Sequence, residues 1–552
     1  MTDSIAQPSA PSFSRVPVPP MEYNLWGTTD EAKPLSPSVQ KLLANMLGAS
    51  AESVDRVAAD DVKLSEPRVT EADLSALAEI VGSGYVTTDR AQRMPRARGK
   101  SYTDLLDWRR RGEISAPDAV VAPGSETEVL RLLQLCGRLD LAVVPFGGGT
   151  SVVGGVNPLA GQHRAVISLD LARFDALEDV DAESGLATLG AGLTGPHAEL
   201  KLAEHGLQLG HFPQSFPYAT IGGFAATRSS GQSSAGYGRF DEMVRSLTVV
   251  TPKGILHPGQ AAPSSAAGPD LKQLFLGSEG TLGIITSVRL RVRPIPKPEA
   301  KRYEAFQFPS FAEGVAAVRA VEQQQTGPTV IRLSDEIESS VNLTSTDSIG
   351  DGGDRATGCL CLTMYEGTPE HTESRHKETR SVLLAHGGTS LGEGPVRAWE
   401  QGRFGAPVLR DGLLDNGAIC ETLETATDWS NAARLKQAVA EVLSNSLQAS
   451  GTMALIMCHI SHVYATGCSL YFTVIAAQQD SPDPVTQWRK AKAAACEAIQ
   501  AAGGTITHHH AVGTDHQPYF STEVQDLGVD ILRAVKAALD PDGILNPGKL
   551  MG

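Results

Sequence analysis

The sequence predicts an α+β protein of several domains, and three observations support this fold class. A chain of 552 residues is long enough for about two to four domains, each with its own core. A strand, a helix, a second strand and a glycine turn follow one another from Pro117 to Ser151. A proline cluster (Pro294, Pro296 and Pro298) then marks a boundary, and strand-like segments of a second unit follow it.

Charge and cysteine content exclude several classes of protein. The chain has 47 Lys and Arg against 63 Asp and Glu, so it lacks the basic surface of a general nucleic-acid binder. No apolar run approaches the roughly 20 residues that cross a bilayer. The seven cysteines form no CxxC pair, which argues against a disulfide framework and a structural zinc site. Because we find no secretory signal at the start and no peroxisomal address at the end, we expect a cytoplasmic protein.

Residues 1–100 are expected to form a Pro/Ser-rich lead followed by a helical segment. The spacing of apolar residues predicts helices over Pro37–Leu47 and Glu71–Val81. Ser36 before Pro37 is a helix-start signal, because serine caps a helix and proline suits its first position.

Residues 101–298 are predicted to form a domain of mixed strands and helices. A strand is predicted at Ala119–Val121 and a helix at Val129–Leu139, with Ser125 as its cap and Glu128 three residues on. The strand Leu141–Pro145 then opens onto the glycine turn. Further strands are predicted at Ala165–Leu169, Leu186–Gly190, Ser246–Thr251 and Thr286–Val292.

Residues 299–485 are predicted to form a second domain, and residues 486–552 a C-terminal helical segment. The second domain contains a Gly/Asp-rich loop, Ser348–Gly353, and its clearest strands are Cys359–Tyr365 and Ser469–Ile475. The C-terminal segment begins with an Ala-rich helix, Trp488–Ala502, and carries three consecutive histidines.

The glycine turn is a candidate anion-binding loop. Gly147, Gly148 and Gly149 leave backbone N–H groups free to point at one phosphate, and Thr150 and Ser151 add hydroxyls. The alternative is an ordinary flexible turn. Two later loops of small residues, Pro213–Gly223 and Gly277–Thr286, also suit close contact with a large flat ligand.

In order and spacing, these loops resemble the flavin domain of the vanillyl-alcohol-oxidase/PCMH-type FAD-binding family. The resemblance implies a two-subdomain domain that binds FAD. The first loop would hold the pyrophosphate, and the later two would wrap the ribityl chain and the ring. The candidate FAD-binding residues are Pro145, Phe146, Gly147, Gly148, Gly149, Thr150, Ser151, Pro213, Gln214, Ser215, Thr220, Gly222, Gly223, Ala226, Thr227, Arg228, Ser229, Glu279, Gly280, Thr281, Leu282, Gly283, Ile284 and Ile285.

The three histidines His508, His509 and His510 are a candidate catalytic base. Adjacent residues of an extended segment point to opposite faces, so the three rings cannot easily share one ion, and we expect no metal. Histidine titrates near neutrality and can remove a carbon-bound proton beside a flavin.

With Val512-Gly513 after it, the triple histidine resembles the signature of the alkyldihydroxyacetonephosphate synthase branch of this flavin family. Other segments agree: Trp26-Gly27, Gly210-His211, Ile331–Leu333, Tyr365–Gly367, Arg410-Asp411 and Gly467–Phe472. The resemblance implies a cap domain with an antiparallel sheet flanked by helices, completed by the C-terminal segment. It also implies FAD bound without a covalent link, and a homodimer.

The same resemblance implies roles for particular residues. One or more of His508, His509 and His510 would abstract a proton from carbon 1 of acyl-dihydroxyacetone phosphate. Tyr471 would exchange protons near the flavin, Arg410 would anchor the anionic substrate, and Arg332 would support the site. The reaction would replace the acyl chain with a fatty alcohol through an adduct at flavin N5, a step of ether-lipid biosynthesis with no net redox change. Peripheral membrane contact stays open.

Two alternatives remain at this point. One is an FAD-dependent 2-hydroxy-acid dehydrogenase or oxidase of the D-lactate or glycolate type, in which Arg410 or Arg332 would bind the carboxylate. Such enzymes often carry a His-rich metal motif in the cap, which Cys458–His462 could mimic. The other is a flavin-binding protein without catalysis.

Overall fold

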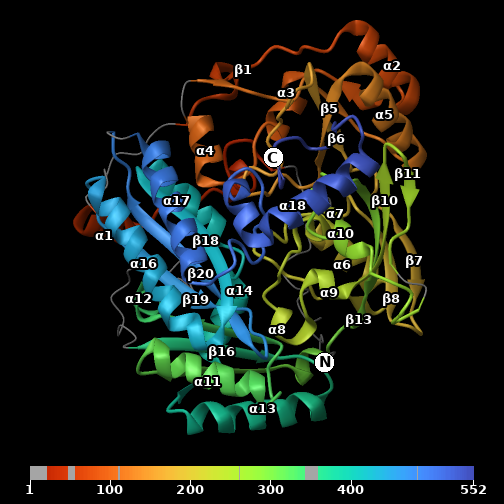
Figure 1. The fold of residues 1–552 in the computed structure, drawn as a ribbon. Helices are drawn as coiled ribbons and strands as arrows, with labels where there is room; N and C mark the ends of the chain where they lie inside the picture. The colour runs from red at the N-terminus through yellow and green to blue at the C-terminus, as the bar shows by residue number, and fades with distance from the viewer. Residues whose placement is uncertain are drawn as a thin grey trace, which may run out of the picture.

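The computed structural model describes residues 21–47, 56–109, 112–259, 262–341, 358–480 and 483–551. The N-terminal lead before residue 21 and the expected loop Ser348–Gly353 lie outside the described residues. Within the described ranges, no helix is both long and apolar enough to cross a bilayer. The elements from α2 to β12 (residues 71–291, here the flavin-type domain) and those from β14 to β20 (residues 302–477, here the cap domain) lie side by side. The C-terminal chain runs between them (Figure 1).

The first part of the flavin-type domain is a small sheet with three parallel strands. Its order is β2-β4-β6-β5, and only β2 runs antiparallel to its neighbour. The Ser125 hydroxyl caps the helix between β4 and β5 by accepting the backbone N–H of Glu128. The bounds in this part are α2 (Glu71–Val81), β2 (Val86–Thr87), α3 (Arg90–Arg93), α4 (Tyr102–Arg109), β4 (Ala119–Val121), α5 (Glu126–Leu139), β5 (Leu141–Phe146) and β6 (Ala165–Asp170).

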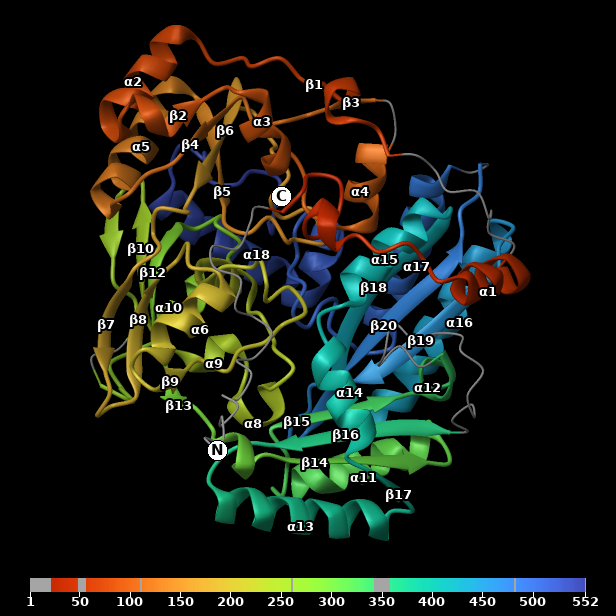
Figure 2. The same cartoon turned by 180° about the vertical axis from the view of Figure 1, so that it is seen from behind.

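The second part is a five-stranded antiparallel sheet of order β11-β10-β12-β8-β7, with short helices over one face (Figure 2). Leu189, Leu247 and Val288 of the sheet share a buried core with Phe224 of the covering helix α7. The bounds are β7 (Leu177–Asp181), β8 (Leu186–Gly190), α6 (Gly195–Ala203), α7 (Ile221–Thr227), α8 (Ser234–Tyr237), α9 (Phe240–Met243), β10 (Val244–Thr251), β11 (Gly254–Leu256), α10 (Lys272–Phe275) and β12 (Ile284–Arg291).

The cap domain is built on a seven-stranded antiparallel sheet of order β17-β14-β16-β15-β19-β20-β18. Strands β18 and β20 pair along their whole length and place Glu424 opposite Tyr471. The bounds are β14 (Arg302–Phe308), α11 (Phe311–Gln323), β15 (Val330–Ser334), α12 (Glu336–Val341), β16 (Cys359–Tyr365), α13 (Pro369–Ala385), β17 (Thr389–Gly392), α14 (Gly394–Gly402), α15 (Ala406–Asp415), β18 (Ala418–Asp428), α16 (Ala432–Ala449), β19 (Ala454–Ile460) and β20 (Gly467–Ala477).

The C-terminal segment joins the two domains. Helix α17 (Pro484–Ala501) buries Trp488 and Ile499 in the core of the cap. The chain then crosses over, and helix α18 (Phe520–Leu539) packs on the flavin-type domain, to whose core Val512 and Phe520 belong. Crossing between domains places the histidine segment at the domain boundary.

The N-terminal segment also contacts both domains. Helix α1 (Pro37–Leu47) and the residue before it, Ser36, match the expected start, and Val39 packs in the core of the cap. The backbone N–H of Trp26 donates to Asp411 Oδ2 in the cap at 2.5 Å. The Lys100 ammonium donates to the carbonyls of Glu22 and Tyr23. This segment therefore lies across the domain boundary.

The predicted α+β class is confirmed, and element ends differ where neighbours extend them. The predicted cap at Ser125 is confirmed, and the first turn that it caps, from Glu126, extends helix α5 ahead of the predicted Val129–Leu139. Strand β20 runs over 467–477, beyond the predicted 469–475, because every residue of it pairs with β18. The domain limits at 100, 298 and 485 stay predictions.

Candidate active site

A cavity of about 380 Å³ lies where the two domains and the C-terminal segment meet. Three glycine-rich loops of the flavin-type domain form part of its wall, and strands β15, β18, β19 and β20 of the cap form another part. The cavity therefore has a backbone-rich side suited to a large cofactor and a side-chain-rich side suited to chemistry.

The first two loops touch each other backbone to backbone. A Cβ atom at Gly148 would lie 2.0 Å from the carbonyl oxygen of Tyr218. At Gly147 it would lie 2.4 Å from the Thr220 hydroxyl, which caps helix α7 by accepting the Gly223 N–H. Gly149 has a φ of +67°, which glycine adopts at low cost. Glycine is required here because a side chain would push the loops apart.

Unsatisfied polar atoms on the cavity wall fit a flavin. Among the described residues, Gln214 Nε2, Ser230 Oγ and Gln232 Oε1 are buried without a hydrogen-bond partner, and all three residues line the cavity. Buried polar atoms are rarely left unpaired in native proteins. A ligand with both donors and acceptors, such as the ring and ribityl chain of FAD, would satisfy them.

Most of the candidate FAD-binding residues line the cavity, and three do not. Arg228 points away and donates to the Leu276 carbonyl and to Asp241. The Thr281 hydroxyl is satisfied by the Ser278 carbonyl, and Leu282 belongs to the core beneath the sheet. We therefore remove Arg228, Thr281 and Leu282 from direct cofactor contact. Sequence adjacency placed them in the loops, but Thr281 and Leu282 are buried, and the Arg228 side chain, 39% exposed, extends toward Asp241.

Neither histidine near the flavin loops is placed for a covalent link. His211 is buried, hydrogen-bonded to the Ser229 hydroxyl, and does not line the cavity. His197 lies beside Thr194 and also faces away from the cavity wall. This arrangement agrees with FAD held by non-covalent contacts.

A buried glutamate from the cap holds the triple histidine. The Glu424 carboxylate accepts the Thr507 hydroxyl at 2.6 Å and the backbone N–H groups of His508, His509 and His510 at 2.5, 3.1 and 2.8 Å. Burial opposes ionisation of Glu424, but the neighbouring histidines and the Thr507 bond lower its pKa well below the ordinary range. Glu424 therefore acts as an anionic anchor for the histidine segment.

A second buried glutamate holds the other end of this segment. Glu279 was a candidate FAD-binding residue, but its carboxylate accepts the backbone N–H groups of Val512 and Gly513 at 3.0 and 2.8 Å. Burial raises the pKa of Glu279 to about 7. The residue lines the cavity, yet its side chain is occupied in fixing the chain beside the flavin loop.

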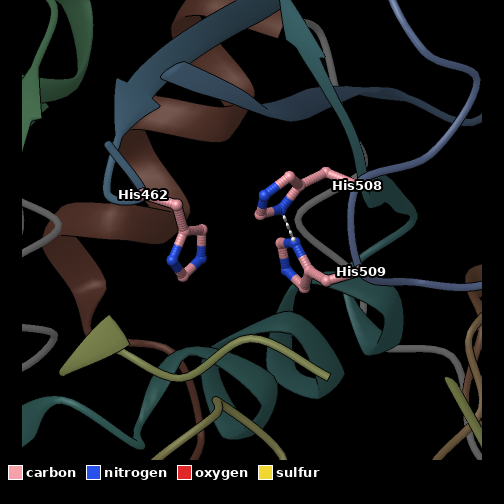
Figure 3. A group of neighbouring side chains, drawn as sticks. All are labelled: His462, His508 and His509. Atoms are coloured by element: carbon pink, nitrogen blue, oxygen red, sulfur yellow. Dashed lines mark hydrogen bonds between the residues drawn. The ribbon is translucent and has the colours of Figure 1, made fainter. Parts of the chain in front are cut away.

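The three histidine rings occupy different positions. His509 and His510 line the cavity, whereas His508 lies behind them. His508 Nδ1 and His509 Nδ1 are 2.9 Å apart and share a hydrogen bond, and His462 faces them from β19's end (Figure 3). Burial lowers the pKa of His508 to about 4, lowers that of His510, and lowers those of His509 and His462 well below the ordinary value. The rings are therefore neutral at pH 7 and able to accept a proton.

Tyr471 on β20 lies directly beside these rings. Its ring stacks on His459 at 4.8 Å and on His509 at 5.9 Å, measured between ring centroids. Burial raises the pKa of Tyr471 to about 12, so its hydroxyl keeps its proton and can donate it. Tyr471 therefore lines the cavity beside His509 and His510.

Arg332 belongs to a compact charged group on the cap sheet. It donates to Glu338 Oε1 at 2.6 Å and lies against both ring nitrogens of His459, at 3.2 and 3.0 Å. Although burial opposes it, the charges of His459 and Arg332 lower the pKa of Glu338 to about 2. Because Glu338 neutralises Arg332, this arginine fixes the wall beneath Tyr471 and is a weak anchor for a substrate anion.

Arg410 on α15 has free donors in the cavity. Its Nη1 donates to the Lys100 carbonyl at 2.6 Å, while Nε and Nη2 have no hydrogen-bond partner in the described part of the chain. Asp411 Oδ1 lies 3.9 Å from Nη2. A guanidinium with two unpaired donors can bind a phosphate or a carboxylate through two bonds.

An apolar stretch of wall completes the cavity. It includes Leu409 and Leu413 of α15, Ile331 of β15 and Ile475 of β20. These side chains offer no hydrogen bonds, so this part of the cavity suits a hydrocarbon chain.

Sequence reasoning missed several residues of the site, above all Glu424, Glu338 and Tyr464. A weak signal existed: acidic residues interrupt the apolar strand Ala418–Asp428, and a buried carboxylate needs partners. No local pattern, however, relates Glu424 to a segment more than 80 residues further on, since strand pairing and domain packing create that contact.

Three of the imidazoles also form a group that could in principle hold a cation. The nearest ring nitrogens of His462, His508 and His509 lie within 4.8 Å of one another. Two features work against a resident ion. The Arg239 charge disfavours positive charge on all three rings, and the Glu424 carboxylate is already satisfied by four donors.

Glycine loops on one side and proton-handling residues on the other define a flavin-dependent enzyme, and family models agree. A model described as "FAD binding domain" matches residues 117–258, and one described as "FAD linked oxidases, C-terminal domain" matches residues 297–550. The protein is an FAD-dependent enzyme.

Individual relatives narrow the class. The chain is 33% identical over 509 residues to the alkyldihydroxyacetonephosphate synthase of Trypanosoma brucei brucei, covering 89% of this chain and 82% of the relative. It is 32% identical over 480 residues to that of Dictyostelium discoideum, covering 84% and 78%. A solved structure of an alkyldihydroxyacetonephosphate synthase superposes with a TM-score of 0.81 at 27% identity, covering 96% and 99%. This chain therefore belongs to the alkyldihydroxyacetonephosphate synthase family.

Gly148→Ala should weaken FAD binding by about tenfold or more. The added Cβ would meet the Tyr218 carbonyl at 2.0 Å and displace the first loop, and overpacking of this kind costs about 1–3 kcal/mol. The flavin-to-protein absorbance ratio after dialysis measures the effect. Gly84→Ala is the control, because nothing lies within 4 Å of its Cβ position. Full flavin content in Gly148→Ala would show that the loop contact is not needed.

Acidification should destabilise the fold before it protonates the site. The buried histidines have folded-state pKa values below the unfolded value of about 6.5, so the unfolded chain takes up protons first as the pH falls. Their stabilising contribution is present above about pH 6.5 and declines toward about pH 4. We expect the thermal midpoint to fall steadily from pH 7.5 to pH 5, and His462→Gln to flatten that slope while exposed His205→Gln does not. A midpoint that is constant over this range would mean that the rings are not neutral.

Proposed function

We propose that this enzyme replaces the acyl chain of an acyl-dihydroxyacetone phosphate with a fatty alcohol. The observation that carries the proposal is one cavity that combines a guanidinium with unpaired donors, neutral histidines and an apolar wall. A phosphate, a proton bound to carbon and a hydrocarbon chain are what these three features respectively fit. Membership of the synthase family points the same way.

Arg410 binds the phosphate in this proposal. Its Nη1 is engaged by the Lys100 carbonyl, whereas Nε and Nη2 have no hydrogen-bond partner among the described residues. The hydrocarbon chain then lies along Leu409, Leu413 and Ile475. Binding at two ends orients carbon 1, which lies between the phosphate and the chain, toward the histidines.

His509 removes the proton from carbon 1. Its Nδ1 is hydrogen-bonded to His508, so Nε2 is the ring atom left for the substrate. Within the described residues Nε2 has no hydrogen bond, and the neutral ring is ready to accept a proton. His510 lines the cavity beside it, and Tyr471 supplies a proton to the departing carboxylate or receives one from the incoming alcohol.

The FAD loops hold the cofactor, which supplies an electrophilic ring that can stabilise the deprotonated carbon. Protein side chains do the rest: they orient carbon 1, move its proton and exclude water. Arg332 and Glu338 hold His459, whose ring stacks on Tyr471 and keeps it in place. No net oxidation of the substrate is required.

A lipid substrate also bears on where the enzyme works and how it assembles. We propose a cytoplasmic protein in ether-lipid biosynthesis that meets its lipid substrates by peripheral membrane contact and acts as a homodimer. Co-sedimentation with liposomes tests the membrane contact, and light scattering tests the homodimer.

The anaerobic flavin spectrum is the most direct test of the reaction. We expect acyl-dihydroxyacetone phosphate to bleach the flavin absorbance of the purified holoenzyme and a fatty alcohol to restore it. D-lactate and glycolate, tested separately, should leave the spectrum unchanged. Lasting bleaching by a hydroxy acid would instead identify a dehydrogenase and overturn the proposal.

Arg410→Ala should raise the KM for acyl-dihydroxyacetone phosphate by about ten- to a hundredfold, because a hydrogen bond to a charged group contributes about 1.5–3 kcal/mol. The KM for the uncharged fatty alcohol should change little. Exposed Arg319→Ala on α11 is the control. An unchanged KM for the phosphate substrate, at normal flavin content, would exclude Arg410 as the anchor.

A further inference from the structure

We infer that His508 and Tyr464 form a proton relay that connects His509 in the cavity with the protein surface. The inference rests on the proposed role of His509 as the base, and it adds a function for two residues that do not touch the substrate. It starts from the position of His508, which is buried behind the cavity wall yet has both ring nitrogens engaged.

The relay is a continuous line of short hydrogen bonds. His509 Nδ1 lies 2.9 Å from His508 Nδ1, and His508 Nε2 lies 2.5 Å from the Tyr464 hydroxyl. The bond between the two histidines is visible in Figure 3. His509 lines the cavity, so the line begins at the substrate.

The other end of the line lies at a turn of the cap surface. Tyr464 is half-buried and opens the turn between β19 and β20, where its backbone N–H donates to the Gly467 carbonyl. The next two residues, Ala465 and Thr466, are exposed. The Tyr464 hydroxyl also lies beside the partly exposed Arg239, so the line ends at polar groups next to this surface turn.

Proton transfer along this line balances at every atom. Before transfer, His509 carries its proton on Nδ1 and donates to His508 Nδ1, while His508 Nε2–H donates to the Tyr464 oxygen. A proton from carbon 1 binds His509 Nε2, the Nδ1 proton passes to His508, and the His508 Nε2 proton passes to Tyr464. Tyr464 releases its own proton to water. One proton enters, one leaves, both rings exchange tautomers, and no electron is transferred.

The residues around His508 and Tyr464 hold the two side chains in position and do not take up the transferred proton. Glu424 binds the backbone N–H groups of the histidine segment and offers no route to solvent, since it is 1% exposed. Arg239 donates to the His508 carbonyl at 3.1 Å and lies beside the Tyr464 hydroxyl. His462 stacks on His508 with ring centroids 5.0 Å apart and fixes the plane of that ring.

Tyr464→Phe tests the relay, because it removes one hydroxyl from a half-buried ring and leaves the packing intact. The measurement is the release of deuterium into water from acyl-dihydroxyacetone phosphate deuterated at carbon 1. We expect release to fall by at least about tenfold, with flavin content and the KM for the phosphate substrate unchanged. Tyr519→Phe, a half-buried tyrosine of the same region, is the matched control and should behave as the parent.

A comparison with His509→Ala separates the two claims. If His509→Ala loses deuterium release and Tyr464→Phe keeps it, the relay is wrong while the assignment of the base stands. If His509→Ala keeps both release and turnover, the base itself is wrong. Loss in both variants, with Tyr519→Phe normal, supports the relay.

A readout without substrate comes from the ring nitrogens of the holoenzyme. Long-range proton–nitrogen NMR spectra should show His508 and His509 as neutral rings whose tautomer balance changes in Tyr464→Phe and not in Tyr519→Phe. Unchanged nitrogen shifts in Tyr464→Phe would contradict the relay. Stoichiometric zinc in the purified holoenzyme would also overturn it, because an ion bound by His462, His508 and His509 would replace the shared proton.

Discussion

The active site depends on two buried carboxylates that hold one segment of backbone from opposite sides. Glu424 of the cap binds the N–H groups of His508 to His510, and Glu279 of the flavin-type domain binds those of Val512 and Gly513. Neither glutamate is near this segment in sequence, and each belongs to a different domain. Since loss of either partner would leave buried N–H groups unpaired, the two interactions fix the histidines and the relative position of the domains together.

This anchoring explains how three adjacent histidines can stay neutral beside an anion. The negative charge of Glu424 is used by backbone donors and the Thr507 hydroxyl, so it does not pair tightly with the rings, whose nitrogens lie 3.6 Å or more from it in His509 and His510. Burial and the nearby Arg239 charge then disfavour protonation of the rings. The segment is therefore held by charge while its side chains keep the uncharged form that a base needs.

The sequence predicts the parts of this enzyme whose chemistry is local. Glycine loops, helix caps and strand alternation are patterns of neighbouring residues, so the fold class and the helices Pro37–Leu47 and Glu71–Val81 are as predicted. Most of the candidate FAD-binding residues line the cavity. Family resemblance supplied Tyr471 and Arg410, which the structure places in the cavity. Contacts that depend on long-range packing cannot be predicted from local sequence patterns. Glu424 and Tyr464 join the site only through sheet pairing and domain closure, and the inward orientation of Leu282 depends on the core beneath it.

The route of the chain explains why the proton-handling residues are divided among three elements. The glycine-rich loops belong to the flavin-type domain, whereas the apolar wall comes from helix α15 and strands β15 and β20 of the cap. A base must reach the point between them, and the C-terminal segment does so by leaving the cap core after α17 and entering the flavin core at Val512. In that position His508, which lies behind the cavity wall, is hydrogen-bonded to Tyr464 in the turn between β19 and β20. Domain crossing thus gives His509 two neighbours at once: the cavity on one side and, on the other, His508, which bonds to Tyr464 of the turn.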